Sequence, residues 1–249
     1  MTARPLTSPP LSVQALHPRP HDRLIVTIDG PAGTGKSTVA RDLARRLGVD
    51  FLDTGAMYRA ATALALDARA DLDDAFAIAD LVRAADLTFR WQDDPPTLLA
   101  RGRSIMHRLR DPDVASAVSP VSALAPVREV LVERQRRIGE VHARLVSEGR
   151  DQGSVVFFDA DVKVYLDAHI KVRAARRADQ LRAAGRPADP IAVEREVRER
   201  DERDSTRAVG PLVCPHDAHR LDTSDLSQPQ VVDRLAEIVH ARVGGRAPA

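Results

Sequence analysis

The order of apolar and polar positions along the chain predicts strands that alternate with helices. Residues 24–29 (LIVTID) form a short, mostly apolar and β-branched run, as expected for a buried parallel strand. After a glycine-rich loop, residues 37–47 carry apolar side chains at helical spacing, and Gly48 ends that helix. This alternation indicates an α/β fold with a parallel sheet. The other expected elements are strands at residues 51–53, 162–166 and 219–222, and helices at residues 57–67, 127–146, 170–184, 191–206 and 231–243.

The middle of the chain breaks this alternation. Residues 87–91 and 97–100 are strand-like runs separated by QDDPP, which is a turn signal. We therefore expect a small antiparallel insert over residues 68–120, within a core made of residues 23–67 and 121–249. Residues 1–22 hold five prolines and no continuous apolar segment, which predicts a disordered leader.

Composition excludes several classes of protein. With 249 residues, 43% hydrophobic and 29% charged, the chain has the make-up of a globular protein with a full core. A formal charge of +1 argues against a nucleic-acid-binding surface. The single cysteine forms no internal disulfide, and no apolar run approaches the ~18 residues that span a membrane. We expect a cytoplasmic protein without a membrane or nucleic-acid partner, and nothing demands more than a monomer.

The loop after the first strand holds a phosphate-binding motif. GPAGTGKS fits G-x-x-x-x-G-K-[ST], with a strand before it and a helix after it. Glycines let backbone N–H groups turn inward around phosphate oxygens, and the helix adds its positive end. Lys36 would lie near the β- and γ-phosphates, and the Ser37 hydroxyl suits Mg²⁺. The expected nucleoside-triphosphate site comprises Gly30, Pro31, Ala32, Gly33, Thr34, Gly35, Lys36, Ser37 and Thr38.

That loop does not identify the acceptor, because GTPases, motor ATPases and small-molecule kinases share it. Two clusters are more informative. In DTGAMYR, Thr54 could hydrogen-bond a substrate and Arg59 could hold a phosphate, although a helix cap with a surface arginine explains it equally. In EGRDQGS, Arg150 suits a phosphate, and Asp151 suits a ribose hydroxyl, a base amino group or Mg²⁺-bound water. The alternative there is a salt-bridged turn.

A third cluster lies on the charged helix predicted at residues 191–206. Arg200, Asp204 and Arg207 follow at i, i+4 and i+7, which places them on one helical face. One face of this helix would close over bound nucleotides as a lid. The alternative is a solvated helix held by two ion pairs, Glu196–Arg200 and Glu199–Arg203.

Four motifs together resemble the bacterial cytidylate kinase family. IDGPAGTGKST, DTGAMYR, SEGRDQGSVVF and RERDERDSTRAVGPL followed by LDTS stand in that family's order and spacing, from about residue 24 to residue 243. The resemblance implies a three-layer P-loop fold with a central parallel sheet, an inserted nucleoside-monophosphate-binding subdomain and a helical lid at about residues 186–208. It implies a phosphotransferase that uses ATP and Mg²⁺ to convert CMP or dCMP into CDP or dCDP.

The resemblance also assigns roles to the residues that match its motifs. Asp53, Thr54 and Arg59 would belong to the substrate site, with Thr54 and Arg59 on the monophosphate. The further assignments are Ser119 and Arg128 to the cytosine and phosphate, Arg150 to the phosphate, Asp151 to the nucleoside, Arg200 and Asp204 to the pentose, and Arg207 to the transferring phosphate. The expected catalytic group is Lys36, Arg59, Arg150 and Arg207.

These residues suit phosphoryl transfer, in which an enzyme mainly positions reactants and neutralises charge. A phosphate monoester has a second pKa of about 6, so the acceptor needs no dedicated base. Two alternatives stay open. One is another small-molecule P-loop kinase, acting on a different monophosphate or on an acid such as shikimate. The other is a regulatory module that binds nucleotide without transferring phosphate.

Overall fold

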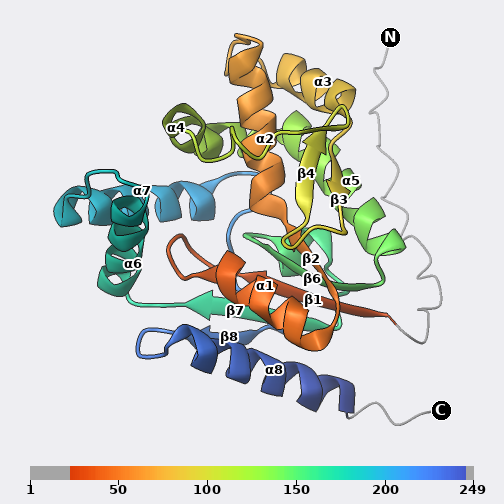
Figure 1. The fold of residues 1–249 in the computed structure, drawn as a ribbon, viewed down its shortest axis with the longest axis vertical. Coiled ribbons are helices and arrows are strands. Elements are labelled where there is room, and N and C mark those ends of the chain that lie inside the picture. The colour runs from red at the N-terminus through yellow and green to blue at the C-terminus, as the bar shows by residue number, and fades with distance from the viewer. Residues whose placement is uncertain (1–22, 245–249) are drawn as a thin grey trace, which may run out of the picture.

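A five-stranded parallel sheet forms the centre of the protein in our computed structural model, which describes residues 23–244 (Figure 1). The strand order is β2-β6-β1-β7-β8, and every neighbouring pair is parallel. The strands are β1 (Leu24–Asp29), β2 (Asp50–Asp53), β6 (Arg144–Gly149), β7 (Val162–Asp167) and β8 (His219–Asp222). The predicted parallel sheet is confirmed, while the predicted leader at residues 1–22 lies outside the described residues.

Helices cover both faces of this sheet, because alternate side chains of each buried strand point to opposite sides. Ile25 and Leu145 pack in one apolar cluster with α2 (Thr54–Asp67) and α5 (Ala125–Val141). The residues next to them on β1 and β6 instead join a second cluster, with α1 (Lys36–Leu47) and α8 (Gln228–Gly244). The result is the expected three-layer arrangement.

The helix predicted over residues 127–146 is wrong at its C-terminal end. Helix α5 ends at Val141, and β6 begins at Arg144 as the central partner of β1 and β2. Leu145 therefore enters the core from a strand and not from a helical stripe. Apolar side chains within a short run fit either period, and here the burial of the five residues from Leu145 to Gly149 favours the strand.

The middle segment carries the expected antiparallel strands and two helices that the sequence pattern did not predict. Strands β3 (Thr88–Arg90) and β4 (Thr97–Ala100) pair as predicted, and β5 (Arg103–Ser104) adds a third strand. The helices are α3 (Ala75–Ala85) and α4 (Pro112–Val121). Both pack into the same core as α2, so the segment stands on that helix at the top of Figure 1.

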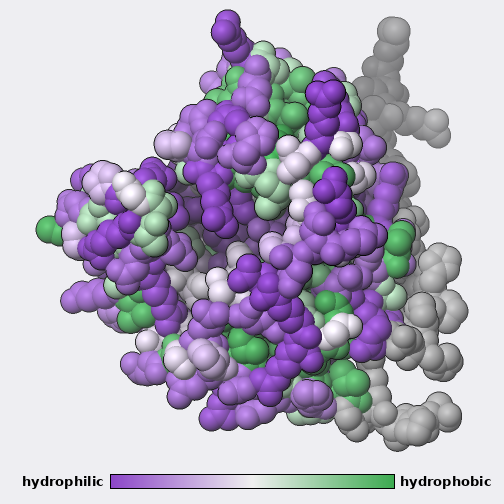
Figure 2. All heavy atoms as spheres, in the orientation of Figure 1, coloured by the Kyte–Doolittle hydropathy of each residue, from purple (hydrophilic) through white to green (hydrophobic). Residues whose placement is uncertain are grey.

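Two charged helices project to the left of the sheet in Figure 1. They are α6 (Ile170–Ala183) and α7 (Pro190–Thr206), and they share a small apolar cluster with Ala32 of the phosphate loop. Hydrophilic residues dominate the face shown in Figure 2, including the hollow between these helices and the body. Within residues 23–244, no helix alone has the length and apolarity to cross a membrane, and the pair α4–α5, bent by 96°, meets only a length and composition criterion.

Candidate active site

Three neighbouring strands deliver the predicted motifs to one edge of the sheet. The glycine loop follows β1, Asp53 ends β2, and Glu148 and Gly149 end β6. Asp29 lies level with Gly149, and Asp53 lies level with Glu148. Because the carboxyl ends of parallel strands meet at one edge, segments far apart in sequence come together here.

The phosphate loop is held tightly against the sheet and against α6. A Cβ on Gly30, whose φ is +149°, would lie 2.1 Å from the carbonyl oxygen of Leu166, so only glycine fits. Lys36 is buried, and its Nζ donates to the Pro31 carbonyl at 2.7 Å. Burial, and the nearby Arg150 and Arg200 guanidinium groups, hold the pKa of the Lys36 ammonium well below its usual range.

Glu148 lies at the centre of the site. Its Oε1 accepts a hydrogen bond from the Ser37 hydroxyl at 2.9 Å, and its side chain is buried. Burial and the neighbouring Asp53 carboxylate raise the pKa of Glu148 to about 7. Two oxygen-bearing side chains from different strands thus meet beside the phosphate loop.

Asp29 joins the donor loop to the motif that follows β6. Its two carboxylate oxygens accept the backbone N–H groups of Gln152 and Gly153 at 2.8 and 2.7 Å. These residues open a single π-helical turn, η1 (Gln152–Val156), which starts directly after Asp151. Burial raises the pKa of Asp29 to about 6 despite these hydrogen bonds. The carboxylate therefore fixes where the Arg150–Asp151 dipeptide stands relative to the loop.

On the acceptor side, the DTGAMYR cluster has both the structural role and the position expected of it. Asp53 caps α2 by accepting from the Ala56 N–H at 2.7 Å, and it also pairs with Arg59 at 3.0 Å. Thr54 is buried and donates to the Glu148 carbonyl at 2.7 Å. Thr54 and Arg59 line the same pocket as the phosphate loop.

Arg128, Asp151 and Arg207 form a buried charge cluster at the wall of this pocket, where Asp151 and Arg207 are part of the lining. Arg128 and Asp151 are ion-paired, and each side chain keeps only 2% of its exposure. Arg207 Nη2 lies 3.8 Å from the other oxygen of Asp151. The Arg128 guanidinium also stands 5.6 Å above the Tyr58 ring. Asp151 of the predicted salt-bridged turn is therefore ion-paired, but its partners are arginines from outside the turn.

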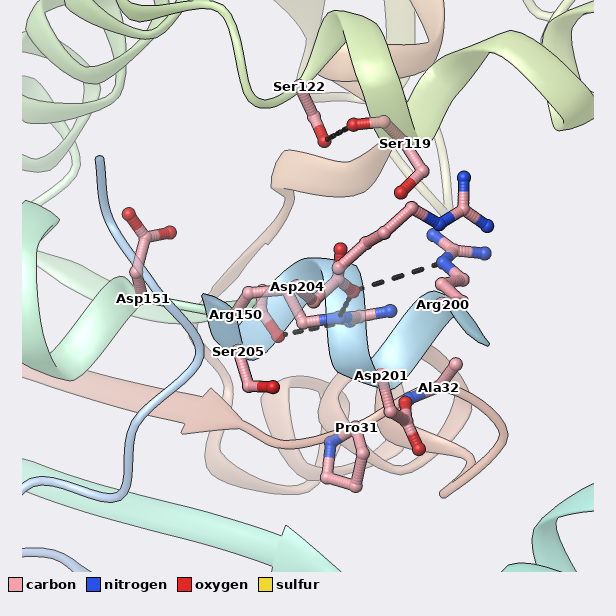
Figure 3. Close-up of polar contacts among 12 residues, drawn as sticks. Pro31, Ala32, Ser119, Ser122, Arg150, Asp151, Arg200, Asp201, Asp204 and Ser205 are labelled. Carbon is pink, nitrogen blue, oxygen red and sulfur yellow. Dashed lines mark hydrogen bonds and ion pairs between the residues drawn. The ribbon is translucent and has the colours of Figure 1, made fainter. Parts of the chain in front are cut away.

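Helix α7, which the sequence predicts to be a lid, contributes Arg200 and Asp204 to the same place (Figure 3). Asp204 Oδ2 accepts from Arg150 Nε at 2.9 Å and lies 3.9 Å from Arg200 Nε. Burial and the adjacent Arg150 lower the pKa of Arg200 to about 10. Arg207 follows the last residue of α7 in extended backbone, so it reaches the pocket from just beyond the helix and not from its face.

The two ion pairs predicted along this helix are wrong. Arg200 pairs with Asp204, and Arg203 donates to the backbone carbonyl of Glu199 and not to its carboxylate. The outward face is held by other contacts, Arg198–Glu194 at 2.7 Å and Arg195–Glu199 at 4.0 Å.

Most of the predicted residues line one pocket, but not all of them. Those that do are Ala32, Gly33, Gly35, Lys36, Ser37, Thr38, Thr54, Arg59, Arg150, Asp151, Arg200, Asp204 and Arg207. Gly30, Pro31, Thr34, Asp53 and Arg128 stand behind this lining, as supports for it. Ser119 lines a neighbouring cleft between α4 and the lid, while Ser122, one turn on, faces the main pocket (Figure 3).

The charge of the pocket suits phosphorylated ligands. Six cationic side chains and four carboxylates line it, and the cations come from five separate segments of the chain. Three of the arginines that the resemblance assigns to the substrate are each held by an aspartate: Arg59 by Asp53, Arg128 by Asp151 and Arg150 by Asp204. Such pairing keeps guanidinium groups oriented where their planar donors can meet phosphate oxygens.

Comparison with known proteins decides the family. The family model described as cytidylate kinase matches residues 26–241, which includes every segment of this pocket. The chain belongs to the cytidylate kinase family. It is 47% identical over 224 residues to the cytidylate kinase of Corynebacterium glutamicum, covering 89% of this chain and 96% of that one. The cytidylate kinases of Rhodococcus jostii (48% over 224 residues, 89% and 97%) and Mycobacterium avium (44% over 219 residues, 88% and 96%) are similar in the same way.

Several pocket residues had been given no role from the sequence. Glu148 and Tyr58 stand inside quoted motifs, but nothing in the sequence showed that both would be buried against the pocket. Arg177 and Gln180 come from α6, whose arginine-rich sequence was the one available signal. In this family member, α6 therefore contributes to the nucleotide pocket as well as supporting the lid.

Proposed function

We propose that the protein transfers the γ-phosphate of ATP to CMP or dCMP and forms CDP or dCDP. The observation that carries this proposal is the single pocket in which the phosphate loop faces arginines from four other segments. A phosphate donor and a phosphorylated acceptor repel each other strongly. Cations that converge from separate segments offset that repulsion, and family membership supplies the acceptor.

Each part of the pocket has a task in this reaction. Lys36 and the loop amides hold the donor phosphates, while Arg59 and Arg150 hold the acceptor phosphate. Arg207 lines the same pocket, and we assign it to the charge that develops on the phosphate during transfer. No general base is needed, because the acceptor oxygen is already largely ionised at neutral pH. Positioning and charge neutralisation by these side chains thus account for catalysis.

Mg²⁺ fits the donor side. The Ser37 hydroxyl and the Glu148 carboxylate, 2.9 Å apart, are the hard oxygen ligands that Mg²⁺ prefers. Within residues 23–244, no group of three or more His, Cys, Asp or Glu side chains could hold a metal alone, which suits an ion held partly by substrate phosphates. When bound, Mg²⁺ would neutralise charge on the transferring phosphate. We assign Ser37, with Glu148, to hold it.

The remaining parts follow from the same proposal. We infer that residues 68–120 act as the monophosphate-binding insert, with Arg128 and Asp151 beneath the nucleoside. Residues of about 186–208 act as the lid, where Arg200 and Asp204 read the pentose. Ser119, on α4, approaches the cytosine. The protein acts on small molecules, as a monomer in the cytoplasm.

A substrate panel tests this function. The protein is supplied with ATP, Mg²⁺ and one of AMP, CMP, dCMP, UMP, GMP or shikimate, and ADP release is followed. We expect strong turnover with CMP and dCMP and weak turnover with UMP. Activity confined to AMP or shikimate would favour the other kinase alternative. Release of ADP that no acceptor accelerates would favour the regulatory module.

A further inference from the structure

One acidic residue of the lid contacts the donor loop and has no part in the roles described so far. We propose that Asp201 is a positioning residue for phosphoryl transfer: it fastens α7 to the phosphate loop and so sets Arg200 and Asp204 over the acceptor side. The inference rests on the proposed function for its effect on catalysis. The contact itself does not depend on that function.

Asp201 closes a three-membered contact with Ala32 and Arg173. Its Oδ1 accepts from the Ala32 N–H at 2.9 Å, and its Oδ2 pairs with Arg173 Nη1. The same Arg173 nitrogen donates to the Ala32 carbonyl at 3.1 Å, and Arg173 Nε donates to the Ala168 carbonyl at 2.8 Å. Both polar groups of Ala32 are therefore held, one by the lid and one by α6. Figure 3 shows Asp201 beside Ala32 and Pro31.

The contact is shielded from water. Ala32 and Arg173 are buried, and the Asp201 side chain keeps 20% of its exposure. Val193 and Val197, two turns and one turn before Asp201, join Ala32 in the same apolar cluster. Hydrogen bonds to a charged group stabilise a protein more than an exposed ion pair does. The lid is thus fixed to the loop by apolar packing along one stripe and by Asp201 at its end.

The position of Asp201 explains why the contact matters for the acceptor. Arg200 precedes it directly, and Asp204 follows at i+3, so all three move with one rigid turn of helix. Asp201 fixes the rotation of that turn about the helix axis, and this rotation brings Asp204 within 2.9 Å of Arg150. By holding α7 to the phosphate loop, Asp201 therefore also positions Arg200 and Asp204 on the acceptor side.

The contact does not use the amides that follow Ala32. The two carboxylate oxygens of Asp201 contact the Ala32 N–H and Arg173, not the N–H groups of Gly33, Thr34, Gly35 or Lys36. Asp201 uses the earlier amide of Ala32 only. The lid is therefore attached at the edge of the loop and does not compete with the donor phosphates for their cradle.

Steady-state kinetics of Asp201→Ala test the proposal, with Glu202→Ala as the matched control. Glu202 is the next residue on α7, and its side chain is exposed. For Asp201→Ala we expect kcat to fall by about 100-fold, as for misplaced catalytic groups, while the KM values for ATP and CMP change little. Asp201→Asn keeps an oxygen for the Ala32 N–H and is expected between wild type and Asp201→Ala. Glu202→Ala is expected to match wild type.

Hydrogen exchange in the protein without ligands provides a readout that is independent of activity. We expect the amides of α7 to exchange about tenfold faster in Asp201→Ala than in wild type or Glu202→Ala, with the melting temperature lowered by only a few degrees. Wild-type kcat with wild-type exchange in Asp201→Ala would overturn the inference, as would tighter ATP binding. If wild type itself does not phosphorylate CMP, the proposed function fails, and exchange alone decides whether Asp201 holds the lid.

Discussion

Replacing Arg128 with methionine removes one member of an almost fully buried ion pair. Arg128 and Asp151 each keep 2% of their side-chain exposure, so the variant strands a carboxylate in a low-dielectric interior. Breaking such a pair from one side costs about 3–5 kcal/mol. Arg207 remains 3.8 Å from Asp151 and offsets part of this cost. Loss of the guanidinium above Tyr58 adds about 0.5–1 kcal/mol. We expect the free energy of unfolding to fall by about 3–4 kcal/mol at pH 7.

Urea unfolding with linear extrapolation measures this change. The control is Arg134→Met on the same helix, whose partner Asp86 keeps 76% of its exposure, and it should cost no more than about 1 kcal/mol. The double variant Arg128→Met/Asp151→Asn leaves no unpaired buried carboxylate, so it should be more stable than Arg128→Met alone. A cost below about 1 kcal/mol for Arg128→Met, or a double variant no more stable than the single one, would refute the reasoning.

Three further predictions concern the pocket. Arg150→Ala should lower kcat by about 100–1,000-fold while ATP still binds in a direct binding assay, and transfer near the wild-type rate would exclude Arg150 from the phosphate site. Folding raises the pKa of Asp29 from 3.8 to about 6, so the free energy of unfolding should fall as pH rises between these values. Asp29→Asn should reduce this dependence of the free energy of unfolding on pH, measured by unfolding at several pH values. An unchanged dependence in the variant would contradict the prediction. Ser37→Ala should raise the Mg²⁺ concentration for half-maximal turnover, and an unchanged Mg²⁺ dependence would remove Ser37 from the metal site.

The elements and motifs that depend on local sequence could be predicted. The phosphate loop is one, because its glycines, Lys36 and Ser37 lie within eight consecutive residues between a strand and a helix. The boundary of α5 could not, because the run after Val141 is compatible with helix or strand until its neighbours are known. Helices α3 and α4 were hidden for a related reason: they are short, and the strand signals between them dominated the pattern.

Contacts between residues far apart in the chain could not be predicted from the sequence. The arginines were identified as candidate phosphate ligands, but nothing indicated that Asp204 would hold Arg150 from 54 residues away. Asp29 and Glu148 acquire their roles only because β1, β2 and β6 are neighbours, which buries both carboxylates beside the loop. Ser119 was assigned to the substrate site from the resemblance, but it lines the neighbouring cleft. Ser122, directly after α4, lines the main pocket.

The fate of the transferred phosphate tests the central claim most directly. ATP labelled at the γ-phosphate is incubated with the protein, Mg²⁺ and CMP, and the labelled products are separated and identified. The account predicts one labelled CDP for each ATP consumed, with little labelled inorganic phosphate. Label that accumulates as inorganic phosphate, or that leaves CMP unmodified, would contradict it.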